Sequence, residues 1–237
     1  MVSQNMEVFL TTSPWINADF LKSNNISYEE ELVFIKKIGT FCHYKKDRII
    51  IGIGTRVDRF FYLQDGIVKY TLLSRGGSEK PVLYVSPGCF FGDEAFFHGQ
   101  PVIFNALAME DVKAISIHKH HLNELFSRPG LVYMLLKSVS LKSRMLANQI
   151  EDLAFRNTTE KLCRLLYCLL LDPSSKQKIN TCIKFTHHEL ANLAGVHRVT
   201  VTNAISHLKE EGIIHTLPDG TIVVDNWDKL RKYGFGE

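Results

Sequence analysis

The sequence has little excess charge and no long apolar segment, and both absences limit what the protein can be. Its 237 residues carry 28 Lys and Arg against 25 Asp and Glu, and a net charge of +3 does not by itself indicate a polyanion partner. No apolar run reaches the roughly 18 residues that a membrane-spanning helix needs. The first 21 residues contain no Lys or Arg, so no signal peptide is predicted. We therefore expect a cytoplasmic protein without a membrane partner.

The sequence is also poor in cysteine patterns and in enzyme fingerprints. Its five cysteines are odd in number, scattered and without CxxC spacing, which argues against a disulfide framework or a structural zinc site. Free thiols are expected, and a redox switch at Cys42, Cys89 or Cys182 stays open as an alternative. Neither a Rossmann nor a P-loop fingerprint occurs, and no His/Glu spacing in the expected strands indicates a metal triad or an acid/base pair. We expect no enzymatic activity and no bound metal.

Glycine usage divides the chain into regions of different structure. Nine of the 15 glycines lie between Gly39 and Gly99, only Gly130 lies between residues 100 and 194, and five follow from Gly195 onward. Short apolar or alternating runs separated by turn residues predict a roll or sandwich of strands between Phe41 and His118, preceded by a short helix from Ser27 to about Gly39. We therefore predict an α+β protein with a β-roll domain (1–118), a helical connector (119–156) and a mixed C-terminal domain (157–237).

One long helix is predicted where glycine is scarce. Ser127-Arg-Pro-Gly130 provides a helix start, and no helix breaker appears before Asn157, so the helix has about 27 residues. Apolar residues within it alternate spacings of three and four, which is the pattern of a heptad seam. Because such a seam is self-complementary on a long helix, it favours a twofold dimer over packing within one chain. The predicted dimer interface is Val132, Leu136, Val139, Ser143, Leu146, Ile150 and Leu153.

The most informative segment is residues 186–214, THHELANLAGVHRVTVTNAISHLKEEGII. It follows a predicted strand, INTCIKF, and a helix whose capping box, Asn157-Thr-Thr-Glu160, places a hinge between domains. Thr186 and Glu189 have the capping-box spacing, Gly195 supplies a turn, and Val201, Ile205 and Leu208 form the apolar stripe of a second helix. Together these features predict a helix-turn-helix. Two further runs, IIHTL and TIVV, flank a Pro-Asp-Gly turn and predict a wing.

The same periodicity turns the polar residues of the second helix outward. Arg198 can reach guanine or a phosphate, Val199 a thymine methyl and Asn203 an adenine, which favours an A/T-rich pseudo-palindrome. Thr200, Thr202 and His207 are expected to contact phosphate. For each polar residue, a solvated surface position is the open alternative. The predicted DNA-binding residues are Thr186, His197, Arg198, Val199, Thr200, Thr202, Asn203 and His207.

With these motifs in hand, the sequence resembles the Crp/Fnr family of bacterial transcription regulators over nearly its whole length. PGCFFGDEAFF resembles the family's phosphate-binding cassette, DLAFRNT its hinge, and ELANLAGVHRVTVTNAISHLKEEGII its DNA-binding helices and wing. The resemblance implies a homodimer that binds double-stranded DNA, contacts RNA polymerase and responds to a small-molecule effector between roll and long helix. The recognition segment GVH-x-VTV is similar to that of the halophenol-sensing members.

Departures from the family pattern exclude its best-known effectors. Cyclic-nucleotide readers have a glutamate after the cassette glycine and an arginine–serine pair about ten residues later, whereas here Asp93 follows Gly92 and Val102-Ile-Phe-Asn105 provides no cation. Cyclic AMP is therefore not expected. Only Cys42 lies in the first 80 residues, so an iron–sulfur cluster is not expected either. A haem sensor with His43 or His98 as ligand stays an alternative, although no cofactor is predicted.

The residues implied by the resemblance define an apolar, aromatic-lined effector pocket. Lys142 lies one position from the heptad seam, where the halophenol sensors place a lysine, and it would pair an aromatic anion such as a phenolate. The alternative is that Lys142 is a solvated helix lysine. A second alternative is a constitutive DNA-binding protein whose roll binds nothing. The predicted effector-binding residues are Leu83, Tyr84, Phe91, Gly92, Asp93, Phe104, Asn105, Lys142, Leu146 and Ala147.

Overall fold

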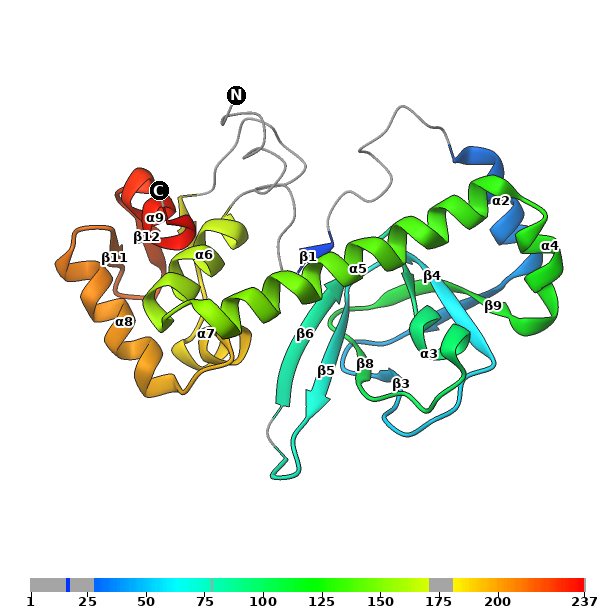
Figure 1. Cartoon of the computed structure of the whole chain (residues 1–237), viewed down its shortest axis with the longest axis horizontal. Helices are drawn as coiled ribbons and strands as arrows, with labels where there is room; N and C mark the ends of the chain where they lie inside the picture. Colours follow the sequence, from blue (N-terminus) through cyan, green and yellow to red (C-terminus); the bar gives the residue numbers. More distant parts are fainter. Residues whose placement is uncertain (1–15, 18–27, 78, 171–180, 237) are drawn as a thin grey trace. The chain divides into compact units, whose positions relative to one another are not determined.

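A computed structural model describes residues 16–17, 28–77, 79–170 and 181–236 (Figure 1). The chain divides into two compact units, one within Pro14–Leu146 and the other within Ala147–Glu237. The border between them falls inside the long helix α5, Pro129–Phe155. Among the described residues, no helix is both long enough and apolar enough to cross a membrane.

The first unit is a β-roll made of two sheets, as the sequence predicts. One sheet has the strand order β1-β6-β5-β8-β3 and the other the order β2-β9-β4-β7. All pairings are antiparallel except that of β1 with β6. The strands are β1 Ile16–Asn17, β2 Thr40–Tyr44, β3 Ile49–Ile51, β4 Arg59–Asp65, β5 Val68–Leu73, β6 Glu79–Val85, β7 Phe90–Phe91, β8 Asn105–Ala108 and β9 Val112–His118.

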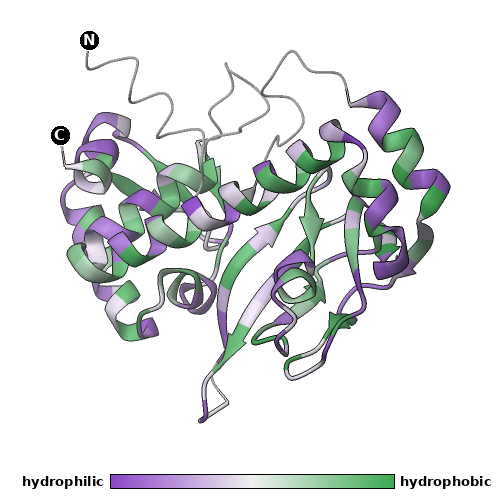
Figure 2. Cartoon of the chain, turned by 45° about the vertical axis from the view of Figure 1, so that its right-hand side comes forward, coloured by the Kyte–Doolittle hydropathy of each residue, from purple (hydrophilic) through white to green (hydrophobic). Residues whose placement is uncertain are grey.

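Alternation along the strands builds the core of this unit. In β6 the side chains of Pro81, Leu83 and Val85 are buried while their neighbours are partly exposed. In β4 the four residues Phe60 to Leu63 are all buried, because elements pack on both faces of this strand. Figure 2 shows hydrophobic residues concentrated along the strands of the roll. The strands that were not predicted include β1, which lies before the predicted roll, β7, which has only two residues, and β8, which lacks the β-branched residues that mark a strand.

Short helices flank the roll. They are α2 Glu29–Ile38, α3 Asp93–His98, the 3-10 turn Lys119–His121 and α4 Leu122–Phe126. The predicted capping residue of α2, Ser27, lies outside the described residues, and Tyr28 occupies the N-cap position without a side-chain cap. Ser127 does not cap α5 as expected, because its hydroxyl donates to the Glu124 carbonyl and α5 begins two residues later.

Helix α5 has 27 residues, as predicted, and two apolar faces. One face is buried in the roll through Leu131, Met134, Leu135 and Met145. The predicted seam lies on another face, where five of its apolar side chains are among the exposed large hydrophobic residues of the chain. These are Leu136, Val139, Leu146, Ile150 and Leu153. Hydrophobic and hydrophilic residues alternate along α5 in Figure 2.

The second unit consists of helices around a small sheet. Its elements are α6 Thr158–Leu170, β10 Cys182–Ile183, α7 His187–Ala194, α8 Arg198–Glu210, β11 Ile214–Thr216, β12 Ile222–Val224 and α9 Trp227–Phe235. The capping box of α6 is confirmed: the Asn157 and Glu160 backbone N–H groups donate to each other's side chains at 2.9 and 3.0 Å. The predicted strand INTCIKF is reduced to the two residues of β10, and its residues 179 and 180 lie outside the described part.

Candidate functional sites

Helices α7 and α8 form the predicted helix-turn-helix. Thr186 caps α7 through a complete capping box, in which the Glu189 N–H donates to Thr186 Oγ1 at 3.2 Å and the Thr186 N–H donates to Glu189 Oε2 at 2.7 Å. These hydrogen bonds lower the pKa of Glu189. Gly195 ends α7 with φ of +69°, a left-handed conformation that glycine adopts without strain.

Helix α8 presents the predicted residues to solvent. Val201, Ala204, Ile205 and Leu208 are buried, so the remaining positions face outward, and Val199 is 70% exposed although it is apolar. This orientation confirms the exposed set read from the periodicity. The exposed residues on and beside α8 include His197, Arg198, Val199, Thr200, Thr202, Asn203, Ser206 and His207.

Two of the outward residues have partners that the sequence did not indicate. The Thr202 hydroxyl donates to the Arg198 carbonyl at 3.1 Å and lies 2.9 Å from His187 Nδ1. Its single proton is therefore already used, and a phosphate contact from Thr202 requires that hydrogen bond to break. The His207 ring packs edge-on against Tyr233, with 6.4 Å between the ring centroids.

The wing is confirmed as two antiparallel strands, β11 and β12, joined around Pro218-Asp-Gly220. The Asp219 carboxylate accepts hydrogen bonds from the Thr221 N–H at 3.0 Å and its hydroxyl at 2.9 Å. Lys184 Nζ approaches the same carboxylate at 3.2 Å. These contacts lower the pKa of Asp219 to about 2, and the hydrogen bond from the Thr221 backbone N–H contributes most. The turn therefore keeps its charge-assisted hydrogen bonds throughout the neutral range.

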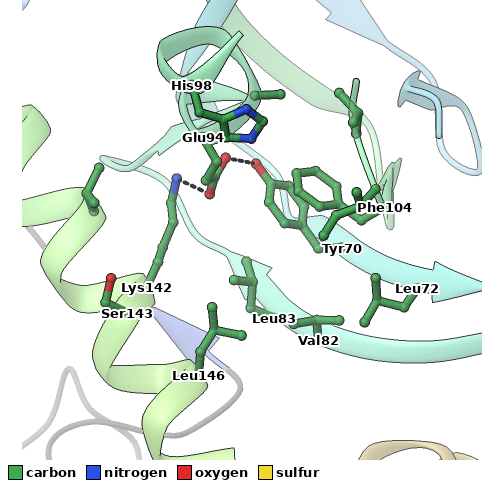
Figure 3. A pocket seen from close by; sticks show the side chains of 14 residues that line it. Tyr70, Leu72, Val82, Leu83, Glu94, His98, Phe104, Lys142, Ser143 and Leu146 are labelled. Atoms are coloured by element: carbon green, nitrogen blue, oxygen red, sulfur yellow. Dashed lines mark hydrogen bonds and ion pairs between the residues drawn. The ribbon is translucent and has the colours of Figure 1, made fainter. Parts of the chain in front are cut away.

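A cavity of about 310 Å³ lies in the roll unit, and Figure 3 shows its walls. Strands β5 and β6, helix α3, the segment before β8 and helix α5 all contribute residues. Its lining residues are Tyr70, Leu72, Val82, Leu83, Glu94, Ala95, His98, Val102, Ile103, Phe104, Val139, Lys142, Ser143 and Leu146.

Four of the ten predicted effector residues line this cavity: Leu83, Phe104, Lys142 and Leu146. The others are placed elsewhere for identifiable reasons. Tyr84 does not border the cavity, Phe91 stacks on Phe61 with 4.8 Å between ring centroids, and Asn105 Oδ1 accepts the Ile53 N–H. Gly92 and Asp93 lie behind the lining residues, and Ala147 is exposed in the other unit.

Lys142 is not a solvated helix lysine, and its ammonium group already has anionic partners within the protein. Its side chain is only 4% exposed; Nζ contacts the Asp93 carboxylate and lies 2.7 Å from Glu94 Oε1. Burial opposes the ammonium charge, but the two carboxylates outweigh it and raise the pKa of Lys142. A phenolate bound here would have to displace one of these carboxylates.

Glu94 and Tyr70 complete the polar end of the cavity, and the sequence pointed to neither. Tyr70 OH donates to Glu94 Oε2 at 3.2 Å and accepts the Gly92 N–H at 2.7 Å. The Tyr70 ring stacks on Phe104 with 4.0 Å between centroids. The signal for Glu94 was its place beside Asp93 in the cassette, but its partner Lys142 is 48 residues away and only the fold brings them together.

The cysteines and histidines considered as sensors lie in different surroundings. Burial raises the pKa of Cys89 to about 12, so this thiol stays protonated, whereas Cys182 is exposed. His98 borders the cavity with Nδ1 accepting the Gln100 N–H at 2.9 Å, and His43 lies 3.7 Å from Asp111. Within the described part of the chain, no three His, Cys, Asp or Glu side chains group together as metal ligands would.

Comparison with known proteins matches both parts of the chain. Residues 41–129 match the family model of a cyclic nucleotide-binding domain, and residues 160–233 match that of a Crp-like helix-turn-helix domain. The transcriptional regulator SdrP of Thermus thermophilus is 30% identical over 166 residues, which cover 70% of this chain and 79% of SdrP. The chain belongs to the Crp/Fnr family.

Other Crp/Fnr proteins support the same assignment. The cyclic AMP receptor protein of T. thermophilus is 25% identical over 194 residues, covering 81% of this chain and 87% of that protein. A crystal structure of a Crp/Fnr-family transcriptional regulator from T. thermophilus has a TM-score of 0.67 at 27% identity, covering 82% of this chain and 98% of the other. As a Crp/Fnr member, the protein is a DNA-binding transcription regulator with a cyclic-nucleotide-binding-like roll.

The wall of the roll cavity includes Val102, Ile103 and Phe104, which carry no charge. The buried cation that is present, Lys142, already pairs two carboxylates.

Proposed function

We propose that the protein is a homodimeric transcription regulator that binds an A/T-rich pseudo-palindrome and is controlled by a small organic effector held in the roll cavity. The observation that carries the DNA part is α8, whose outward face presents Arg198, Val199 and Asn203 beside a wing. The exposed seam of α5 supports the dimer, because an apolar row on a long helix is stabilised by burial against a second copy. Dimerisation places two recognition helices on half-sites one helical turn apart, about 34 Å.

The proposed effector is small and largely apolar, aromatic compounds included, rather than cyclic AMP. A cavity of about 310 Å³ with mainly aliphatic and aromatic walls supports this class. The likeness of the recognition segment to halophenol sensors adds phenols to the candidates. With Lys142 paired, a phenol would bind in its neutral form and donate its proton to Glu94. Binding controls DNA affinity only if the effector has different affinities for the two arrangements of the protein.

We also propose that the protein acts in the cytoplasm and that RNA polymerase is one of its partners, as for a regulator of this family. A constitutive DNA-binding protein is the second candidate, and effector titrations distinguish the two. DNA affinity that never changes with any bound ligand would support the constitutive alternative.

The DNA-binding part is tested by fluorescence anisotropy with a library of pseudo-palindromic duplexes, reporting the preferred base at each position. Arg198→Ala is expected to cost about 1 to 3 kcal/mol and to relax the preference at one base pair per half-site. Glu110→Ala, an exposed change in the roll unit, is the control and leaves the preference intact. Unchanged specificity in the Arg198 variant would refute its assignment to base reading.

A further inference from the structure

The ionic groups at the cavity are divided between its wall and the interior behind it. Asp93 is fully buried and contacts Lys142, whose side chain is 4% exposed. Glu94, on the same turn of α3, is 27% exposed and borders the cavity (Figure 3). The charge of Lys142 is therefore balanced within the protein by Asp93, and Glu94 is the carboxylate that a ligand in the cavity can reach.

The three charged groups sum to one negative charge at neutral pH. Burial raises the pKa of Asp93 to about 6, partly offset by Lys142, and this value still leaves the carboxylate mainly ionised at pH 7. Lys142 keeps its proton, because the two carboxylates raise its pKa. The remaining lining residues described by the structure are apolar apart from Tyr70, His98 and Ser143. A ligand in the cavity thus meets an apolar wall and the Glu94 carboxylate, which shares the single positive charge of Lys142 with Asp93.

Glu94 has the capacity to accept a further donor. Its Oε1 accepts from Lys142 at 2.7 Å and its Oε2 from the Tyr70 hydroxyl at 3.2 Å. A carboxylate has about four acceptor positions, so about two remain. Hydrogen bonds between ionised partners are shorter and stronger than neutral ones, which favours a charged donor at this position.

We propose that the effector of this cavity is a small organic cation, an amine with an apolar body whose ammonium group is paired by Glu94. This inference rests on the proposed function, because it names the chemical class of that function's effector. The apolar body occupies the space among Leu83, Val139 and Leu146, and the ammonium group lies at the end formed by Glu94 and Tyr70. A volume of about 310 Å³ lies at the lower end of the range for sites that bind small organic molecules, about 300 to 1,000 Å³.

Through Glu94, a bound ligand can affect a contact that the long helix α5 makes. Glu94 belongs to α3 and Lys142 to α5, so an ammonium group at Glu94 competes with the Lys142 ammonium for one carboxylate. An anionic ligand would instead be repelled by Glu94.

The test uses calorimetric titration of the full-length protein with three compounds of one skeleton: 2-phenylethylamine, 2-phenylethanol and phenylacetate. We expect the amine to bind at least tenfold more tightly than the alcohol, and phenylacetate to bind most weakly. Glu94→Gln keeps the side-chain shape and leaves the buried Asp93–Lys142 pair intact. This variant is expected to lose at least tenfold in amine affinity and to stay within threefold for the alcohol. Glu110→Gln, on an exposed position of the same unit, is the matched control.

The measurements on the unaltered protein keep the proposal falsifiable if the Glu94 variant folds poorly. Phenylacetate binding as tightly as the amine overturns the proposal, and so does the absence of amine binding at millimolar concentration. DNA binding is measured separately on the same samples. Intact DNA binding without amine binding rejects this inference alone, whereas amine binding without DNA binding rejects the proposed function.

Discussion

Arg164 of α6 and Asp152 of α5 form an ion pair in the interior of the second unit. The Arg164 side chain is 2% exposed and that of Asp152 is 7% exposed. Arg156 Nε approaches the same carboxylate at 2.9 Å, and its Nη1 donates to the Gly234 carbonyl of α9 at 2.6 Å. These contacts connect both sides of Asn157, where the sequence predicts a hinge. A bend at Asn157 therefore requires the pair to break.

Removing Arg164 is expected to leave a buried, poorly paired carboxylate. Burial already raises the pKa of Asp152, although Arg164 and Arg156 oppose this shift. Arg164→Ala is expected to cost about 3 to 5 kcal/mol of unfolding free energy, and the double variant Arg164→Met with Asp152→Leu to recover part of it. Lys161→Ala on the same helix is the control. The measurement is denaturant unfolding followed by Trp227 fluorescence in a Trp15→Phe background, which leaves one tryptophan. A loss below 1 kcal/mol would contradict the argument.

Gly234 allows α9 to pack directly against the backbone of α6. A Cβ at this position would lie 3.0 Å from the Arg164 nitrogen and 3.1 Å from its Cα. Backbone atoms cannot move aside as a flexible side chain can, so Gly234→Ala is expected to destabilise the unit by about 1 to 3 kcal/mol. Gly76→Ala, where the nearest atom is 3.9 Å away, is the control and should be nearly neutral. Equal melting temperatures for the two variants would show that α9 tolerates the displacement.

The capping box of α7 predicts a pH dependence of stability. The Thr186 backbone and side-chain hydrogen bonds lower the pKa of Glu189 in the folded state. The contribution of Glu189 is therefore complete above its unfolded pKa of about 4.3 and is lost as pH falls through the lower, folded value. Glu189→Gln is expected to be less stable than the unaltered protein at pH 6, and the difference is expected to shrink as the pH falls below about 4.3. Unfolding curves at several pH values test this, with exposed Glu210→Gln as control. A constant difference across the range would contradict it.

The exposed row on α5 predicts the oligomeric state. Leu136 is 61% exposed and Ile150 is 65% exposed in the single chain. Leu136→Glu is expected to weaken the dimer at least tenfold, because it buries a charge in an apolar contact. Val33→Glu on α2, where the valine is 67% exposed, is the matched control outside the row and should leave association unchanged. Sedimentation equilibrium distinguishes the outcomes, and a monomeric unaltered protein would reject the dimer itself.

The elements that were predictable from the sequence are those whose structure depends on contacts between residues close together in the chain. The helix-turn-helix follows from Thr186, Glu189 and Gly195, whose roles involve contacts within a few residues, and the length of α5 follows from the lack of breakers between Gly130 and Asn157. Helix α9 was missed, although Asn226 caps it and Gly236 ends it, because its apolar stripe is short.

The cavity was only partly predictable, since its walls come together through contacts between distant segments. The sequence predicts both Leu83 and Tyr84 in the cavity wall, and the structure places Leu83 there but not Tyr84. The pairing of Lys142 with Asp93 and Glu94 spans 49 and 48 residues, and no local pattern signals it. The sequence could thus locate Lys142 near the cavity while giving no indication that its charge was already neutralised.

All described residues around the cavity lie between Tyr70 and Leu146, and the outward residues of α8 lie beyond Asn157. Under the proposed function, ligand preference and operator preference would therefore be encoded in consecutive, non-overlapping parts of the gene. Recombination within the part of the gene that encodes α5 would join the roll of one ancestor to the DNA-binding unit of another. The hybrid would combine the ligand preference of the first ancestor with the target promoters of the second, and neither part would need to change.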